Sequence, residues 1–140
     1  MRKKAVSLVS VLLLMALLST QAFAATTTRN FTLQKAGGGT ITGMHTLTAS
    51  RNSPPDNRYY GSYTTTASQG CHITFCDRSY SHFSSGKIYW SDYSTTSYVT
   101  RASDTQYAYT TSIPILKVTG VFMVEHPSVA TSAMNLEAAY

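Results

Sequence analysis

Hydrophobic and polar residues alternate with a period of two along much of the chain. Phe31 and Leu33 alternate with polar neighbours, and after the three glycines at 37–39 the alternation resumes over residues 41–49. Because residues two apart on a strand face the same side of a sheet, this pattern predicts two strands joined by a glycine turn, in a hairpin.

The alternation recurs further along the chain. It predicts strands over residues 59–67, 87–93, 96–101 and 105–112, with a short strand over 71–76. Pro54 and Pro55 predict a loop, because proline lacks the backbone donor of a strand ladder, and the polar residues 77–86 predict a turn. Residues 115–124 are apolar on both faces, which is typical of a central strand.

These elements indicate an all-β fold. About eight short strands, with turn signals every ~8 to 12 residues, are typical of a small antiparallel β-sandwich or barrel. Ser128 is a helix-capping residue type, and the apolar residues after it predict a short C-terminal helix by their spacing: Val129, Ala133, Leu136 and Tyr140. The threonines at 26–28 are expected to form a frayed end.

The first residues have the composition of an export signal. Arg2, Lys3 and Lys4 precede an apolar run over residues 6–18, and Ala22 and Ala24 supply the small residues that a signal peptidase requires. We expect a secretory signal peptide of the bacterial type over residues 1–24, followed by a single all-β domain over residues 25–140. The alternative is an uncleaved anchor, but the run is shorter than the ~20 residues that a spanning helix needs.

No apolar tail follows at the C-terminus, so we expect no stable membrane anchor after cleavage and a secreted, extracellular protein. The full chain of 140 residues has a formal net charge of +5. Three of its eleven Lys and Arg residues lie in the predicted signal, so the other eight nearly balance six Asp and Glu residues, leaving +2. These basic residues are spread singly along the chain, whereas nucleic-acid-binding proteins cluster them, so no nucleic-acid partner is expected.

Serine and threonine make up 35 of the 116 residues after the signal, and all ten tyrosines lie there. Leu, Ile, Val and Phe number only 18 in the same part of the chain. Tyrosine and threonine favour strands, so the composition indicates a folded β domain with a thin aliphatic core and aromatic padding.

Cys71 and Cys76 are the only cysteines. In an exported protein we expect them to form a disulfide, which requires a bulge or turn between them because residues five apart on a regular strand face opposite ways. Two inert thiols are the first alternative. A zinc site with His72 and His82 is the second, but the spacing is not a familiar zinc pattern, so no metal or other cofactor is expected.

Catalytic motifs are missing from the sequence. It contains neither a G-x-S-x-G elbow nor an H-E-x-x-H pair, and the glycines at 37–39 lack the lysine of a phosphate loop. His45 lies in an apolar alternation with Ile41 and Leu47, which favours a hydrogen-bonded histidine in the core or at its edge. We expect no enzyme, and a small hydrolase built around His72 or His82 is the weakest alternative.

Aromatic residues are dense on otherwise polar strands. A tyrosine combines an apolar ring with a hydroxyl, so exposed tyrosines among Ser and Thr form an adaptable binding surface. Neighbours on a strand face opposite ways, so some of these rings are exposed unless both faces are covered. Tyr98, Tyr107 and Tyr109 form one such group, and the candidate binding residues are Tyr59, Tyr60, Tyr63, Tyr89, Trp90, Tyr93 and Tyr98. The competing interpretation is that these rings form the core and cross-strand pairs.

We therefore expect a secreted, non-catalytic binding protein that acts at or outside the cell surface through a Tyr/Ser/Thr-rich face, with a glycan, the cell wall or a protein as its ligand. Small secreted β-sandwich bacteriocins of the lactococcin 972 type are similar in having an export signal and strands rich in Tyr, Ser and Thr. Their mature chains are shorter and generally lack the cysteine pair. This compositional resemblance implies the alternative, a bacteriocin-like antimicrobial or toxin acting on target cell envelopes, and assigns no residue a role.

Overall fold

The computed structural model describes residues 24–52, 58–82, 86–109 and 114–140. All of the predicted signal peptide except Ala24 therefore lies outside the described residues, as do 53–57 in the predicted proline loop. The described residues form eight strands: β1 (Ala24–Gln34), β2 (Thr40–Arg51), β3 (Arg58–His82), β4 (Gly86–Tyr89), β5 (Tyr93–Ser94), β6 (Val99–Tyr109), β7 (Ile115–His126) and β8 (Val129–Ala139). They contain no helix, and thus none that is long and apolar enough to cross a membrane.

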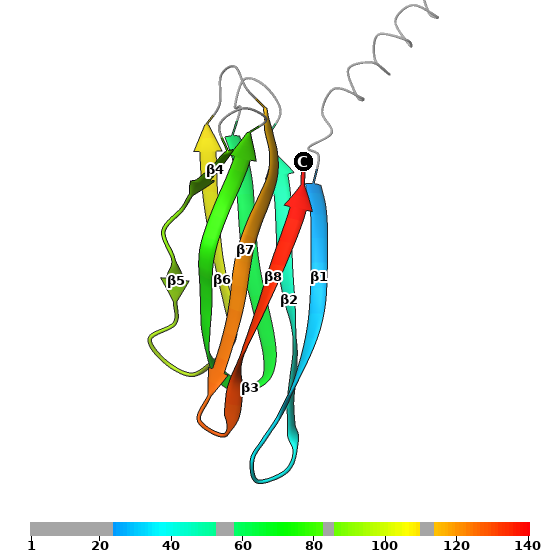
Figure 1. Cartoon of the computed structure of the whole chain (residues 1–140), viewed down its shortest axis with the longest axis vertical. Helices are drawn as coiled ribbons and strands as arrows, with labels where there is room; N and C mark the ends of the chain where they lie inside the picture. Colours follow the sequence, from blue (N-terminus) through cyan, green and yellow to red (C-terminus); the bar gives the residue numbers. More distant parts are fainter. Residues whose placement is uncertain (1–23, 53–57, 83–85, 110–113) are drawn as a thin grey trace, which may run out of the picture.

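The strands form two antiparallel sheets that face each other (Figure 1). In sheet A, β1, β2, the first half of β3, and β6 lie in that order. In sheet B, the short strands β4 and β5 both pair with one edge of the second half of β3. The other edge of this half pairs with β7, and β7 pairs with β8. β1 and β8 lie side by side, where the Thr27 hydroxyl donates to the Glu137 carbonyl at 2.7 Å. The arrangement of the strands is nearly closed and barrel-like. Because the described residues form strands and no helix, the prediction of a small all-β fold is confirmed.

Strand β3 has 25 residues and belongs to both sheets. The sequence predicts two strands and a turn here, and the structure joins them. The register with β6 is irregular between Thr66 and Cys71, where β3 passes from sheet A to sheet B. A second irregularity lies between Cys76 and Ser79, where Asp77 has a φ of 48°. Bulges bend a strand without ending it, which explains the continuous element.

The end of the chain is a strand, so the predicted C-terminal helix is wrong. β8 pairs with β7 along its length and buries Leu136 and Ala138, which are two residues apart. The ladder of hydrogen bonds to β7 outweighs a weak local preference for helix. β7 itself pairs on both sides, as predicted for a central strand. The threonines 26–28, predicted to fray, pair with residues 46–48 of β2.

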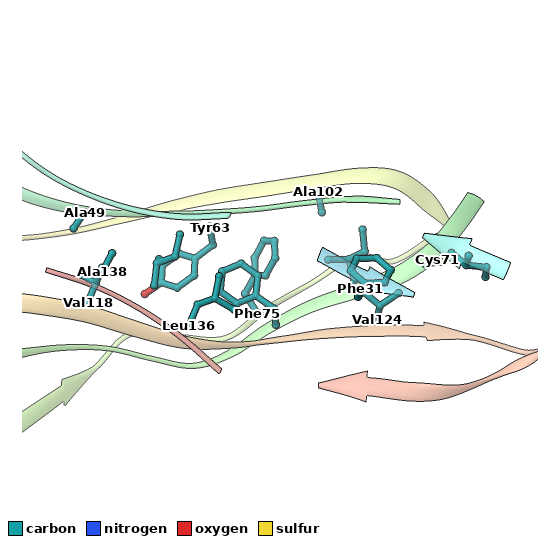
Figure 2. Packing of buried hydrophobic residues seen from close by; sticks show 14 residues of the cluster. Phe31, Ala49, Tyr63, Cys71, Phe75, Ala102, Val118, Val124, Leu136 and Ala138 are labelled. Carbon is teal, nitrogen blue, oxygen red and sulfur yellow. The ribbon is translucent and has the colours of Figure 1, made fainter. Parts of the chain in front are cut away.

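The hydrophobic core fills the space between the sheets (Figure 2). Tyr63 from sheet A is fully buried and donates its hydroxyl to the Thr119 carbonyl of β7 at 2.9 Å. The ring of Phe31 packs against Gly43, its partner across the β1–β2 ladder. Phe75 and Phe122 contact Tyr63 from sheet B, with ring centroids 6.0 and 5.7 Å from the tyrosine ring. Aromatic rings therefore share the centre of the core with aliphatic side chains such as Ile41, Leu47 and Val118.

The predicted disulfide is not formed: Cys71 and Cys76 are both free. Cys71 is buried between the sheets, whereas the Cys76 sulfur lies 3.5 Å from the Met123 sulfur. The register of β3 with β7 is regular from His72 to Cys76, so no bulge lies where a bridge would need one. The two side chains consequently leave the strand on opposite faces, which excludes the bond.

Candidate functional site

Four of the seven candidate binding residues contribute to the core. Tyr59 and Tyr63 point inward from β3 and are buried. Tyr93 is half-buried and stacks on Phe75 at 5.4 Å between centroids. Trp90 is half-buried and packs against Tyr80 at 4.9 Å. The positions of these four side chains agree with the alternative interpretation, in which the aromatic rings pack in the core.

The other three candidates are accessible but lie on different elements. Tyr60 projects from the outer side of β3, next to the inward-facing Tyr59, as strand parity requires. Tyr89 of β4 is 61% exposed. Tyr98 is 52% exposed and packs its ring 4.3 Å from that of His72. The three do not form one surface among themselves.

The structure instead joins Tyr60 to two tyrosines of β6. Tyr60 and Tyr107 are register partners, with ring centroids 6.1 Å apart. Tyr107 and Tyr109 meet edge to face at 5.5 Å and are 52% and 59% exposed. The guanidinium carbon of Arg58 lies 5.5 Å from the Tyr107 ring centroid and 5.1 Å from that of Tyr109. We call these four residues the tyrosine–arginine patch.

Hydroxyl groups cover much of the same outer face of sheet A. The register aligns two rows across all four strands, namely Thr26, Thr48, Ser62 and Thr105, and beside it Thr28, Thr46, Thr64 and Ser103. Within the first row, the hydroxyls of Thr26 and Thr48 lie 3.0 Å apart, as do those of Ser62 and Thr105. Each hydroxyl has one donor and two acceptor lone pairs, so such pairing leaves capacity for a ligand. We call the outward residues of sheet A the hydroxyl face.

The charges on the hydroxyl face have one sign. Arg58 and Arg101 are its charged residues, and the outward positions of β1, β2, β6 and the first half of β3 include no Asp or Glu. Asp104 lies on β6 but points inward, where it accepts a hydrogen bond from Arg78 Nη1. Among the described parts of the chain, Glu125 and Glu137 belong to sheet B.

His45 is paired with a hydroxyl group in the interior of the protein. His45 Nδ1 lies 2.8 Å from the Thr65 hydroxyl, but both residues are fully buried. The His45 ring stacks on Phe31 at 4.7 Å, and its Nε2 has no hydrogen-bond partner within the described structure. This is the hydrogen-bonded core histidine that the alternation around it predicts. His72 and His82 join no group of three His, Cys, Asp or Glu residues able to hold a metal, within the described segments.

His45 is expected to make stability depend on pH. Burial lowers the pKa of His45 from 6.5 to about 4. Between these values the unfolded chain binds a proton that the folded protein does not, so stability falls as the pH is lowered. The full effect is about 3 kcal/mol by pH 4. Urea unfolding across this range should show the slope, and His45→Gln should remove it. An equal slope in the variant would mean that another group is responsible.

A pocket of about 310 Å³ lies at one end of the core, lined by Arg51, Tyr59, Pro114, Ile115, Leu116 and Tyr140. Arg51 is stacked on the Tyr59 ring at 5.0 Å, and the Tyr140 hydroxyl donates to the Tyr60 carbonyl at 2.8 Å. Among the residues that the structure describes, the lining of this pocket includes no acid and no imidazole.

Compared with known proteins, the chain matches no family model, no curated protein and no solved structure. The sequence groups Tyr107 and Tyr109 with Tyr98 as aromatic residues, but it does not place them among the predicted binding residues. Two facts are needed to identify them: which face of β6 the odd-numbered residues occupy, and how β6 is aligned with β3. The alignment depends on pairing between distant segments of the chain.

Proposed function

We propose that this protein is a secreted, non-catalytic binding protein that recognises a glycan through the hydroxyl face of sheet A. The observation that carries the proposal is the gathering of Tyr60, Tyr107 and Tyr109 with Arg58 at one end of a face lined with Ser and Thr. Large exposed aromatic groups on a soluble domain are typical of an interaction site.

The chemistry of this face suits a sugar polymer. An exposed tyrosine ring offers an apolar platform to the C–H face of a sugar ring, and its own hydroxyl can pair with a sugar hydroxyl. The Ser and Thr residues next to the patch both donate and accept hydrogen bonds, which complements a ligand that does the same at every unit. An open sheet face also accommodates an extended ligand, for which an enclosed pocket is not needed.

Two features favour binding over catalysis. The His45–Thr65 pair is buried beyond the reach of a substrate. The tyrosine–arginine patch consists of phenol and guanidinium groups, and the described outward side chains around it include neither a carboxylate nor an imidazole to act as acid or base.

Replacing both Tyr107 and Tyr109 by alanine is expected to weaken glycan binding about tenfold or more, equivalent to about 1.4 kcal/mol. The reason is the loss of two rings that expose more than half of their surface. Affinity electrophoresis in gels containing peptidoglycan fragments, soluble chitin or plant and bacterial polysaccharides measures the change. Tyr89→Ala is the matched control, because Tyr89 is equally exposed but belongs to sheet B.

The proposal fails if the wild-type protein binds no polysaccharide, or if Tyr89→Ala weakens binding as much as the double variant. Killing of target cells or leakage from vesicles, without polysaccharide binding, would instead support the antimicrobial alternative.

A further inference from the structure

This inference rests on the proposed function and names the ligand class. We infer that the ligand is a neutral polysaccharide, bound as a single chain rather than as the flat face of a crystalline polymer. Its sugar units stack on the rings of Tyr60, Tyr107 and Tyr109, and the chain continues over the hydroxyl pairs that follow on β3 and β6.

The three tyrosine rings do not share a plane. Tyr107 and Tyr109 meet at an interplanar angle of 89°, and Tyr60 is inclined by 48° to Tyr107. A crystalline polysaccharide presents its sugar rings in one flat layer, so Tyr107 cannot lie flat on such a layer together with either neighbour. A single chain turns at each glycosidic bond and can present successive units to differently inclined rings. The inclination of the rings therefore favours an isolated chain.

The charge of Arg58 is already engaged within the protein. Its guanidinium carbon lies 5.5 Å from the Tyr107 ring centroid and 5.1 Å from that of Tyr109, and Arg58 has a further interaction besides these two. A cation over an aromatic face is attracted by the ring itself. The patch therefore needs no anionic group from a ligand to balance this arginine.

Arg101 is the other charged residue of the hydroxyl face, and it lies far from the rings. It pairs with Thr66, six residues along β3 from Tyr60, which corresponds to about 20 Å at ~3.3 Å per residue. The Debye length at physiological ionic strength is about 8 Å, so the charge of Arg101 is largely screened at the rings. The described outward side chains of β3 and β6 in sheet A include no acid. A sugar on the rings thus meets aromatic and hydroxyl groups, which suit a ligand without charge.

Hydroxyl pairs extend the path beyond the rings. Ser62 lies two residues along β3 from Tyr60, and its hydroxyl is 3.0 Å from that of Thr105. One hydroxyl of the pair donates to the other, so the pair keeps one donor and several acceptor lone pairs for a ligand. Thr64 and Ser103 are partners at the next step of the ladder. A polysaccharide chain that leaves the rings along the strands therefore meets groups that complement its own hydroxyls.

The experiment compares two physical forms of the same polymer. Binding is measured to cellulose, chitin and mannan, each in a swollen amorphous form and in a crystalline form, at equal amounts of accessible sugar. We expect at least one of them to be bound about tenfold tighter in its amorphous form. Polygalacturonate and peptidoglycan fragments represent charged polymers, and added salt should change the affinity for the neutral polymer by less than about twofold.

Single variants test the rings and the charge separately. Tyr60→Ala and Tyr109→Ala should each weaken binding to the amorphous polymer about threefold or more, because the two rings stack on different sugar units. Arg101→Gln should leave this binding unchanged. Tyr89→Ala is the matched control for the loss of an exposed ring, since Tyr89 belongs to sheet B.

The outcomes separate the two proposals. Equal or tighter binding to the crystalline forms, or unchanged binding in either ring variant, overturns the single chain and leaves the proposed function in place. Weaker binding by Arg101→Gln, or a preference for a charged polymer, overturns the neutral ligand in the same way. Binding to no polysaccharide overturns both.

Discussion

Replacing Asp104 by alanine should lower the free energy of unfolding by about 3–5 kcal/mol. The side chain of Arg78 is 1% exposed, and its guanidinium donates from Nη1 to Asp104 and from Nη2 to the Ser91 carbonyl. It also lies 5.4 Å from the Tyr63 ring centroid. Without Asp104 this buried charge keeps no carboxylate partner, and an unpaired buried charge is among the most destabilising features of a folded protein.

Urea unfolding of the variant measures this loss. Glu137→Ala is the matched control, because it breaks the exposed Lys117–Glu137 pair of 2.7 Å and should cost less than about 1 kcal/mol. Combining Asp104→Ala with Arg78→Met should restore part of the stability, since it removes the charge as well as its partner. A cost below about 1 kcal/mol for Asp104→Ala would show that the pair contributes little.

The Arg78–Asp104 pair should also make the stability of the protein depend on pH in strong acid. Burial raises the pKa of Asp104, but hydrogen bonds from Arg78 and Gln106 and the charge of Arg78 outweigh burial, so the pKa is lowered overall. The stabilisation is therefore complete above the ordinary aspartate range and is lost as the pH falls through the lowered pKa. This loss occurs at lower pH than the effect of His45.

Gly43→Ala is expected to destabilise the protein by more than about 3 kcal/mol or to prevent folding. A Cβ at Gly43 would meet the Thr66 carbonyl oxygen and the ring of Phe31. The carbonyl belongs to the paired backbone of β3 and cannot move without disturbing the β2–β3 ladder. The ring can move only by leaving its place against His45.

The matched control is Gly37→Ala in the turn between β1 and β2, where a Cβ meets nothing within 4 Å. Circular dichroism and thermal unfolding of the two variants give the comparison. We expect Gly37→Ala to unfold near the wild-type temperature and Gly43→Ala far below it. Equal unfolding temperatures would mean that the β2–β3 ladder yields more easily than its hydrogen bonding indicates.

The period-two pattern was sufficient to predict the fold class, because each of the long strands has one face in the core. It could not show that residues 58–82 are one strand, since the polar segment around Asp77 has the composition of a turn and is kept in the sheet by pairing with β4 and β7. The C-terminal strand was missed for the same reason: short apolar repeats such as Leu136 and Ala138 fit either period until a partner strand selects one.

The sequence was sufficient to predict a surface rich in Tyr, Ser and Thr, but it was not sufficient to predict which tyrosines lie together on it. Because neighbouring residues on a strand point to opposite faces, the sequence correctly places Tyr59 and Tyr60 on different faces of the sheet. It does not show which of the two faces the core. The patch depends on the meeting of Tyr60 with Tyr107, which the β3–β6 register determines. Register results from packing of both faces and from loop geometry, so one strand examined alone does not contain it.

The sharing of β3 between two sheets also has a consequence for how the protein opens. The first half of β3 pairs with β2 and β6, and the second half pairs with β7, which in turn pairs with β8. Neither sheet can detach as a whole without exposing the half of β3 that belongs to the other, so we expect the two sheets to unfold together. Amide hydrogens in the middle of β3 should therefore exchange with solvent only through unfolding of the whole domain.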